Sequence, residues 1–161
     1  MTPTGTDERP IQGKHDDLTS KIIGVFFEVY KELGSGFLES VYRESMRVAL
    51  VQAGLGVSAE VPVPVSFRGE LVGVFRADLI VNNLVLIELK ACEALLREHE
   101  SHALNYLKAA RIEVALLMNF GKAPRFRRLI MDNEFKRLGI GSVSSVSIGV
   151  KPLADIPEVI S

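Results

Sequence analysis

A run of apolar residues that ends in two charges constrains the fold of this chain most. Leu84-Val85-Leu86-Ile87 is apolar on both faces of any strand it forms, and Glu88-Leu89-Lys90 follows directly. Strands that are apolar on both faces lie in sheets that are covered on both sides. We therefore expect Leu84–Ala91 to be a central strand of a layered domain.

Helical and extended segments surround this strand. Apolar residues recur at helical spacing over 16–33, which we expect Asp16 or Asp17 to cap, and over 37–53, which we expect Gly36 to cap. Pro62 and Pro64 confine the strand predicted at 59–67 to an edge of the sheet. The other predicted elements are strands at 71–81, 112–118 and 126–131 and a helix at 95–110. This order, α-α-β-β-β-α-β-β, predicts an α/β fold with a mixed central sheet flanked by helices.

The length of 161 residues and a hydrophobic fraction of 47% predict one domain with an ample core. We expect a disordered arm at 1–15, the folded domain at 16–134, and an extension at 135–161 that shows no helical period and that we do not place. The start is polar and acidic, and no apolar run approaches the roughly 20 residues that span a bilayer. We therefore expect a soluble, cytoplasmic protein without a membrane partner.

Cys92 is the single cysteine of the chain. One cysteine excludes an internal disulfide and a zinc cluster built from cysteines. No basic partner is evident beside it in the sequence, so we interpret Cys92 as a small buried residue and not as a nucleophile.

A second carboxylate, Asp78, lies inside the apolar strand that precedes the central one. Glu88 and Lys90 alone are more simply explained as ions that pair or reach solvent, and the turn at Asn82-Asn83 leaves two registers open. A two-residue loop turns Asp78 away from Glu88, whereas a three-residue loop or a bulge places them opposite each other, with β-carbons roughly 5 Å apart. Two such carboxylates repel, and Mg²⁺ or Mn²⁺ would relieve the conflict. Lys90 on the same face could then hold a phosphate oxygen, which suits hydrolysis of a phosphodiester.

Side chains on two helices are further candidates. Glu39 would either cap its helix or bind metal or water. On the helix at 95–110, His102 and Tyr106 are four apart and share a face, which we expect at the rim of the site. His99 and His102 have no third zinc ligand nearby, so a structural helix face is the stronger interpretation.

Several motifs resemble a known family. Gly36-Phe37-Leu38-Glu39-Ser40-Val41-Tyr42 resembles the signature of the GxxExxY proteins, a branch of the PD-(D/E)XK nuclease superfamily. Arg76-Ala77-Asp78-Leu79 and Glu88-Leu89-Lys90-Ala91 are similar to the Asp and Glu-x-Lys core of that superfamily. Asn105-Tyr106-Leu107-Lys108 and Met118-Asn119-Phe120-Gly121 resemble later segments. The resemblance runs from about Leu18 to Met131.

The resemblance implies a restriction-endonuclease-like core with Asp78 and Glu88 as metal ligands, Lys90 as the catalytic lysine and Glu39 as an additional helical acid. His102 and Tyr106 occupy the spacing of a Gln-x-x-x-Tyr pair in RecB-like nucleases, with His in place of Gln. The expected function is a Mg²⁺- or Mn²⁺-dependent nuclease acting on DNA, or as a second choice RNA.

The charge distribution leaves two other functions open. The net charge is −1, although residues 85–137 carry 10 Lys/Arg against 7 Asp/Glu. Tight binding to DNA draws on several cationic contacts to phosphate. A module with a nuclease-like fold that binds nucleic acid or assembles with protein is therefore the alternative, and a small-molecule phosphoesterase is the third. A chain this short covers little DNA, which a homodimer would remedy.

Overall fold

The computed structural model describes residues 13–138 and confirms the expected α/β architecture. The helices are α1 (Asp16–Leu33), α2 (Glu39–Gln52), α3 (Arg97–Ala109) and α4 (Asn133–Leu138). The strands are β1 (Val57–Phe67), β2 (Glu70–Val81), β3 (Val85–Lys90), β4 (Val114–Phe120) and β5 (Pro124–Ile130). The predicted order of elements is confirmed, with α4 as an addition.

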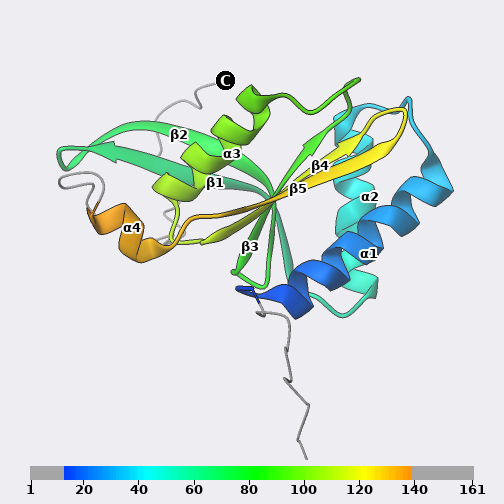
Figure 1. Cartoon of the computed structure of the whole chain (residues 1–161), viewed down its shortest axis with the longest axis horizontal. Helices are drawn as coiled ribbons and strands as arrows, with labels where there is room; N and C mark the ends of the chain where they lie inside the picture. The colour runs from blue at the N-terminus through cyan, green and yellow to red at the C-terminus, as the bar shows by residue number, and fades with distance from the viewer. Residues whose placement is uncertain (1–12, 139–161) are drawn as a thin grey trace, which may run out of the picture.

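The five strands form one mixed sheet in the order β1-β2-β3-β4-β5. The pair β3–β4 is parallel and is connected through α3, and the other neighbouring pairs are antiparallel. Figure 1 shows α1 and α2 on one face of the sheet and α3 on the other. β3 is therefore central and covered on both sides, as its apolar start predicts, and the proline-containing β1 lies at an edge.

The core consists of two clusters, one on each face of the sheet. Leu79 and Val81 of β2 pack in the cluster under α1 and α2, whereas Phe75 and Ala77 of the same strand pack in the cluster under α3. Residues two apart in a regular strand share a face, so β2 must twist out of the regular pattern at Asp78. The opposite residue on β1 is Glu60, whose backbone has a positive φ of 49°. The long β1–β2 hairpin thus changes faces at the point where the candidate site lies.

The predicted helix caps are wrong in detail. The N-cap of α1 is His15, with a left-handed φ of 58°, and no side chain caps the helix. Asp16 is already helical, and its carboxylate instead accepts the backbone N–H of Gly13 in the preceding turn. At the other end, Gly34 adopts a φ of 68° and ends α1 as predicted.

The second helix begins two residues later than predicted, at Glu39, and its N-cap is Leu38 in place of Gly36. The reason lies in Tyr42, whose buried hydroxyl donates to the carbonyl oxygen of Gly34 at 2.6 Å and accepts the backbone N–H of Phe37 at 3.2 Å. These bonds hold the connection between α1 and α2 in a non-helical path.

The helix α4 includes Glu134 and continues to Leu138, although the sequence after Glu134 shows no helical period. Lys136 of α4 donates from Nζ to the carbonyl oxygens of Ala110 and Ile112, each at 2.8 Å, and so attaches α4 to the end of α3. Residues 1–12 of the predicted arm and 139–161 of the predicted extension lie outside the described residues. Among the helices of residues 13–138, none has the length and hydropathy needed to cross a bilayer.

Candidate metal centre

The turn between β2 and β3 decides which side chains meet. Val81 pairs with Val85, so the loop has three residues, and Asn82 and Asn83 adopt the positive φ values of 51° and 56° that asparagine tolerates. Of the two registers that the sequence leaves open, the structure therefore has the one that places Asp78 opposite Glu88.

The strands β2 and β3 separate at these two residues, and we call this place the fork. The last regular pair is Leu79 with Ile87. Beyond it, the backbone N–H of Asp78 donates to Oε1 of Glu88 at 3.3 Å, and the N–H of Leu89 donates to Oδ2 of Asp78 at 2.8 Å. Two carboxylates thus take the places that backbone carbonyls hold in a regular ladder, and this brings them together in the middle of the sheet.

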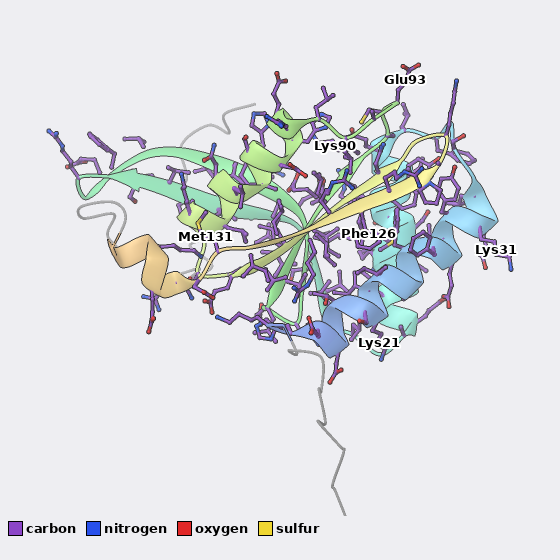
Figure 2. The ribbon with its side chains drawn as sticks, viewed as in Figure 1. Lys21, Lys31, Lys90, Glu93, Phe126 and Met131 are labelled. Atoms are coloured by element: carbon purple, nitrogen blue, oxygen red, sulfur yellow. The ribbon has the colours of Figure 1, made fainter. Side chains whose placement is uncertain are left out.

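The environment of the fork penalises negative charge on Glu88. The residue is only 7% exposed, and burial, followed by the charge of Asp78, raises the pKa of Glu88 to about 8. The N–H of Asp78 and the charge of Lys90 act in the opposite direction. Lys90, two residues further along β3, is half-buried (Figure 2). A cation bound at the fork would remove the repulsion that opposes ionisation of Glu88.

Arg43 is the site residue that sequence reasoning missed. Its guanidinium reaches from α2 to within 3.5 Å of Oδ1 of Asp78 and 3.4 Å of Oε1 of Glu60. Arg43 therefore balances part of the negative charge at the fork from the α2 side. No local spacing in the sequence could have identified it, because the contact joins α2 to β2 across the fold.

Glu39, the additional helical acid of the prediction, occupies a different environment. It is the first residue of α2 and is exposed. A carboxylate at this position is favourable because the helix N-terminus carries partial positive charge. Among the described residues, Glu39 forms no hydrogen bond or ion pair with the fork, so the structure does not bring it together with Asp78 and Glu88.

The fork is bounded on the other face of the sheet by Tyr106 of α3. The ring of Tyr106 stacks on Phe75 with 3.8 Å between centroids. Partial burial, and then the charges of Glu88 and Asp78, raise the pKa of Tyr106. The pKa of Tyr106 thus responds to both carboxylates of the fork, and its place at the rim of a site stays a prediction.

The histidines of α3 differ in their surroundings. His102 is exposed one turn before Tyr106. His99 accepts the backbone N–H of Leu96 on Nδ1 at 3.0 Å and so satisfies a donor at the helix start. This contact supports the structural interpretation of His99. Within residues 13–138, no group of three or more His, Cys, Asp or Glu side chains could hold a metal ion.

The chain that leaves Lys90 is held by Asn119 of β4. Oδ1 of Asn119 accepts the backbone N–H of Cys92 at 3.0 Å, and its Nδ2 donates to the carbonyl of Cys92 at 2.9 Å. A β-carbon added to Gly121 would meet that carbonyl oxygen at 2.3 Å. Asn119 and Gly121 therefore fix the end of β3. Cys92 itself is partly exposed, not buried as predicted, because its thiol lies in this connection and donates to the carbonyl of Ala94 at 3.2 Å.

The donor set at the fork fits a hard divalent cation with few protein ligands. Asp78 and Glu88 supply oxygen atoms only, and Mg²⁺ is commonly held through one or two carboxylates while it keeps several waters. A closed site built from four protein ligands, as structural zinc requires, does not fit these residues.

Comparisons with known proteins identify the family of this chain. The family model described as "PD-(D/E)XK nuclease superfamily" matches residues 16–129. The crystal structure of SSO0001 is similar, with a TM-score of 0.49 and 15% identity, over 73% of this chain and 60% of that one. This chain thus spans less than two thirds of that protein, and a comparison with curated proteins gives no match. The family match covers most of the described domain, including both carboxylates of the fork, and the chain therefore belongs to the PD-(D/E)XK nuclease superfamily.

Proposed function

We propose that the protein is a Mg²⁺- or Mn²⁺-dependent nuclease that hydrolyses phosphodiester bonds, with DNA as its substrate. The observation that carries the proposal is the fork itself. The carboxylates of Asp78 and Glu88 accept backbone N–H groups where β2 and β3 would otherwise pair through their backbones. Glu88 lies in the middle of the sheet although burial opposes its charge. Nuclease activity fits the superfamily, whose members generally use divalent metals.

In this proposal each side chain has a defined task. The carboxylates of Asp78 and Glu88 bind the cation, which when bound supplies positive charge and lowers the pKa of water. The ammonium of Lys90, on the same face as Glu88, binds a phosphate oxygen and favours the negative charge that develops there. The hydroxyl of Tyr106 and the imidazole of His102 lie along α3, from which they donate hydrogen bonds to neighbouring phosphates.

Membership of the GxxExxY branch is part of the proposal. Its support is the motif from Gly36 to Tyr42, in which Tyr42 fixes the connection between the two helices. Glu39 enters the proposal as the additional helical acid, a ligand of metal or of water at the exposed start of α2. A homodimer would extend the DNA that one copy of the domain can cover, and the single cysteine is compatible with a cytoplasmic location.

Cleavage assays test the proposal. Linear, circular and single-stranded DNA are incubated with the protein and Mg²⁺ or Mn²⁺, alongside the Lys90→Ala variant and a single-stranded RNA. Metal-dependent cutting by the wild type that is lost in Lys90→Ala is the expected result. Circular DNA separates internal from terminal cleavage. Cutting that persists unchanged in Lys90→Ala would remove Lys90 from the reaction.

One observation favours a second function, that of a binding module without turnover. Oδ2 of Asp78 accepts the N–H of Leu89, and Oδ1 lies beside Arg43, so protein groups already engage this carboxylate. Such a module would bind nucleic acid in EDTA and leave it intact when Mg²⁺ or Mn²⁺ is added. Hydrolysis of nucleotides or model esters, without hydrolysis of polymers, would instead indicate a small-molecule phosphoesterase.

A further inference from the structure

Two arginines of the edge strand β5 lie on the same face of the sheet as the candidate site. Lys90 of β3 pairs with Asn119 of β4, which pairs with Arg125 of β5. Directly paired residues of neighbouring strands point to the same face. Lys90 and Arg125 therefore belong to one row across three strands. The adjacent row places Glu88 and Arg127 together in the same way, through Leu117.

The packing of α3 identifies which face this is. Leu129, two residues after Arg127, packs in the cluster under α3. Arg127 itself forms an ion pair with Glu100 in the first turn of α3, with 3.2 Å between Nε and Oε1. The two arginines therefore face the α3 side, whereas α1 and α2 cover the opposite side (Figure 1).

Both guanidinium groups are available to a ligand. Arg125 and Arg127 are exposed. The guanidinium of Arg125 donates to the carbonyl of Pro124 at the long distance of 3.5 Å, and that of Arg127 donates to the carbonyl of Phe126 at 3.1 Å. The ion pair of Arg127 joins side chains that are 52% and 34% exposed. Pairs of this kind contribute little net free energy, because water and salt screen them. A phosphate can therefore replace Glu100 as the partner of Arg127.

We propose that Arg125 and Arg127 bind backbone phosphates of the nucleic-acid strand whose scissile phosphate lies at Lys90. The proposal rests on the nuclease function above for its ligand. Two strand spacings of about 4.8 Å separate the backbone of Lys90 from that of Arg125, which gives on the order of 10 Å. Phosphates advance about 3.4 Å per nucleotide along the axis of one strand. The row therefore spans more than one nucleotide, and the substrate strand passes from β3 toward β5 over the connection at Cys92, which covers Asn119.

Glu100 has an opposing role in this arrangement. Its carboxylate lies beside Arg127 and would repel a phosphate that approaches the same guanidinium. Glu100 keeps Arg127 oriented without substrate and weakens the binding of nucleic acid. Removal of the Glu100 charge should therefore increase the affinity for nucleic acid. This increase should occur only in a protein that retains Arg127.

Equilibrium binding of a fluorescent DNA duplex in EDTA tests this surface without any catalytic step. The double variant Arg125→Gln, Arg127→Gln removes two positive charges from β5. The control Lys21→Gln, Lys31→Gln removes two exposed positive charges from α1, on the other side of the sheet (Figure 2). The β5 variant should bind at least about fivefold more weakly and lose about 1.8 from the slope of log K against log salt, at about 0.9 per phosphate contact. The control should stay within about twofold of the wild type.

Equal losses in the two double variants would reduce the effect to net charge and overturn the proposal. So would unchanged binding by the β5 variant, or no binding of DNA by the wild type. As an independent arm, Glu100→Gln should tighten binding in the wild type and have no effect in Arg127→Gln. If the cleavage assay fails while these differences in binding hold, the nuclease proposal fails and the binding surface stands. If DNA is cut but the β5 variant binds like the wild type, the surface alone is wrong.

Discussion

Replacement of Glu88 by Gln should make the metal-free protein more stable at alkaline pH. The pKa of Glu88 is raised from an ordinary 4.5 to about 8 by burial and by the charge of Asp78, so the native state binds this proton more tightly than the unfolded state. The free energy of unfolding is then highest below the ordinary pKa and falls as pH rises toward and through about 8. At about 1.4 kcal/mol per pKa unit, the full shift corresponds to about 5 kcal/mol. This is a large fraction of the stability of a small domain.

Urea denaturation in EDTA, followed by circular dichroism because the chain has no Trp, measures this effect. The amide of Glu88→Gln keeps an oxygen that can accept the N–H of Asp78 and carries no charge. The difference in unfolding free energy, variant minus wild type, should grow by about 3 kcal/mol between about pH 5 and pH 8. Millimolar Mg²⁺ should stabilise the wild type and not the variant at the alkaline end. A difference in unfolding free energy that does not change with pH would refute the argument that burial disfavours the charged form of Glu88.

Two further predictions concern the parts that hold the site. Tyr42→Phe should lower the free energy of unfolding by about 1 to 3 kcal/mol in chemical denaturation, because the buried carbonyl of Gly34 loses its hydroxyl donor; an unchanged midpoint would contradict this role. Gly121→Ala should destabilise by about 1 to 3 kcal/mol, because its β-carbon would collide with the carbonyl oxygen of Cys92. The matched control is Gly24→Ala in α1, where an added β-carbon would meet no heavy atom within 4 Å beyond the adjacent residues and the backbone of its own helix. It should stabilise by about 0.5 to 1 kcal/mol. Equal effects of the two alanines on the thermal midpoint would refute the close approach at Gly121.

The fold follows from local patterns of the sequence, and most of it could be predicted for that reason. The change of period from helix to strand, the glycines that end α1 and the prolines of β1 each act within a few residues. Helix starts were less predictable. The start of α2 depends on the hydroxyl of Tyr42, which forms hydrogen bonds with the backbone of Gly34 and Phe37. These bonds form only when the chain folds back on itself, so local spacing does not predict them.

The sequence names candidate site residues but leaves their geometry open. A difference of one residue in the loop at Asn82-Asn83 turns Asp78 toward Glu88 or away from it, and both loops suit asparagine. The contact of Arg43 with Asp78 joins α2 to β2, a pairing that no spacing in the sequence specifies. The change of faces at Asp78 is also a property of the packed sheet, because it depends on which cluster each neighbouring residue joins.

Binding of Mn²⁺ tests the central claim most directly, which is that Asp78 and Glu88 form one divalent-cation site. Electron paramagnetic resonance gives the affinity of the wild type and of Asp78→Asn above about pH 8, where Glu88 is ionised. Circular dichroism confirms that each protein is folded. The account predicts a Mn²⁺ site in the wild type that Asp78→Asn weakens at least about tenfold. A folded Asp78→Asn protein that binds Mn²⁺ with unchanged affinity would contradict it.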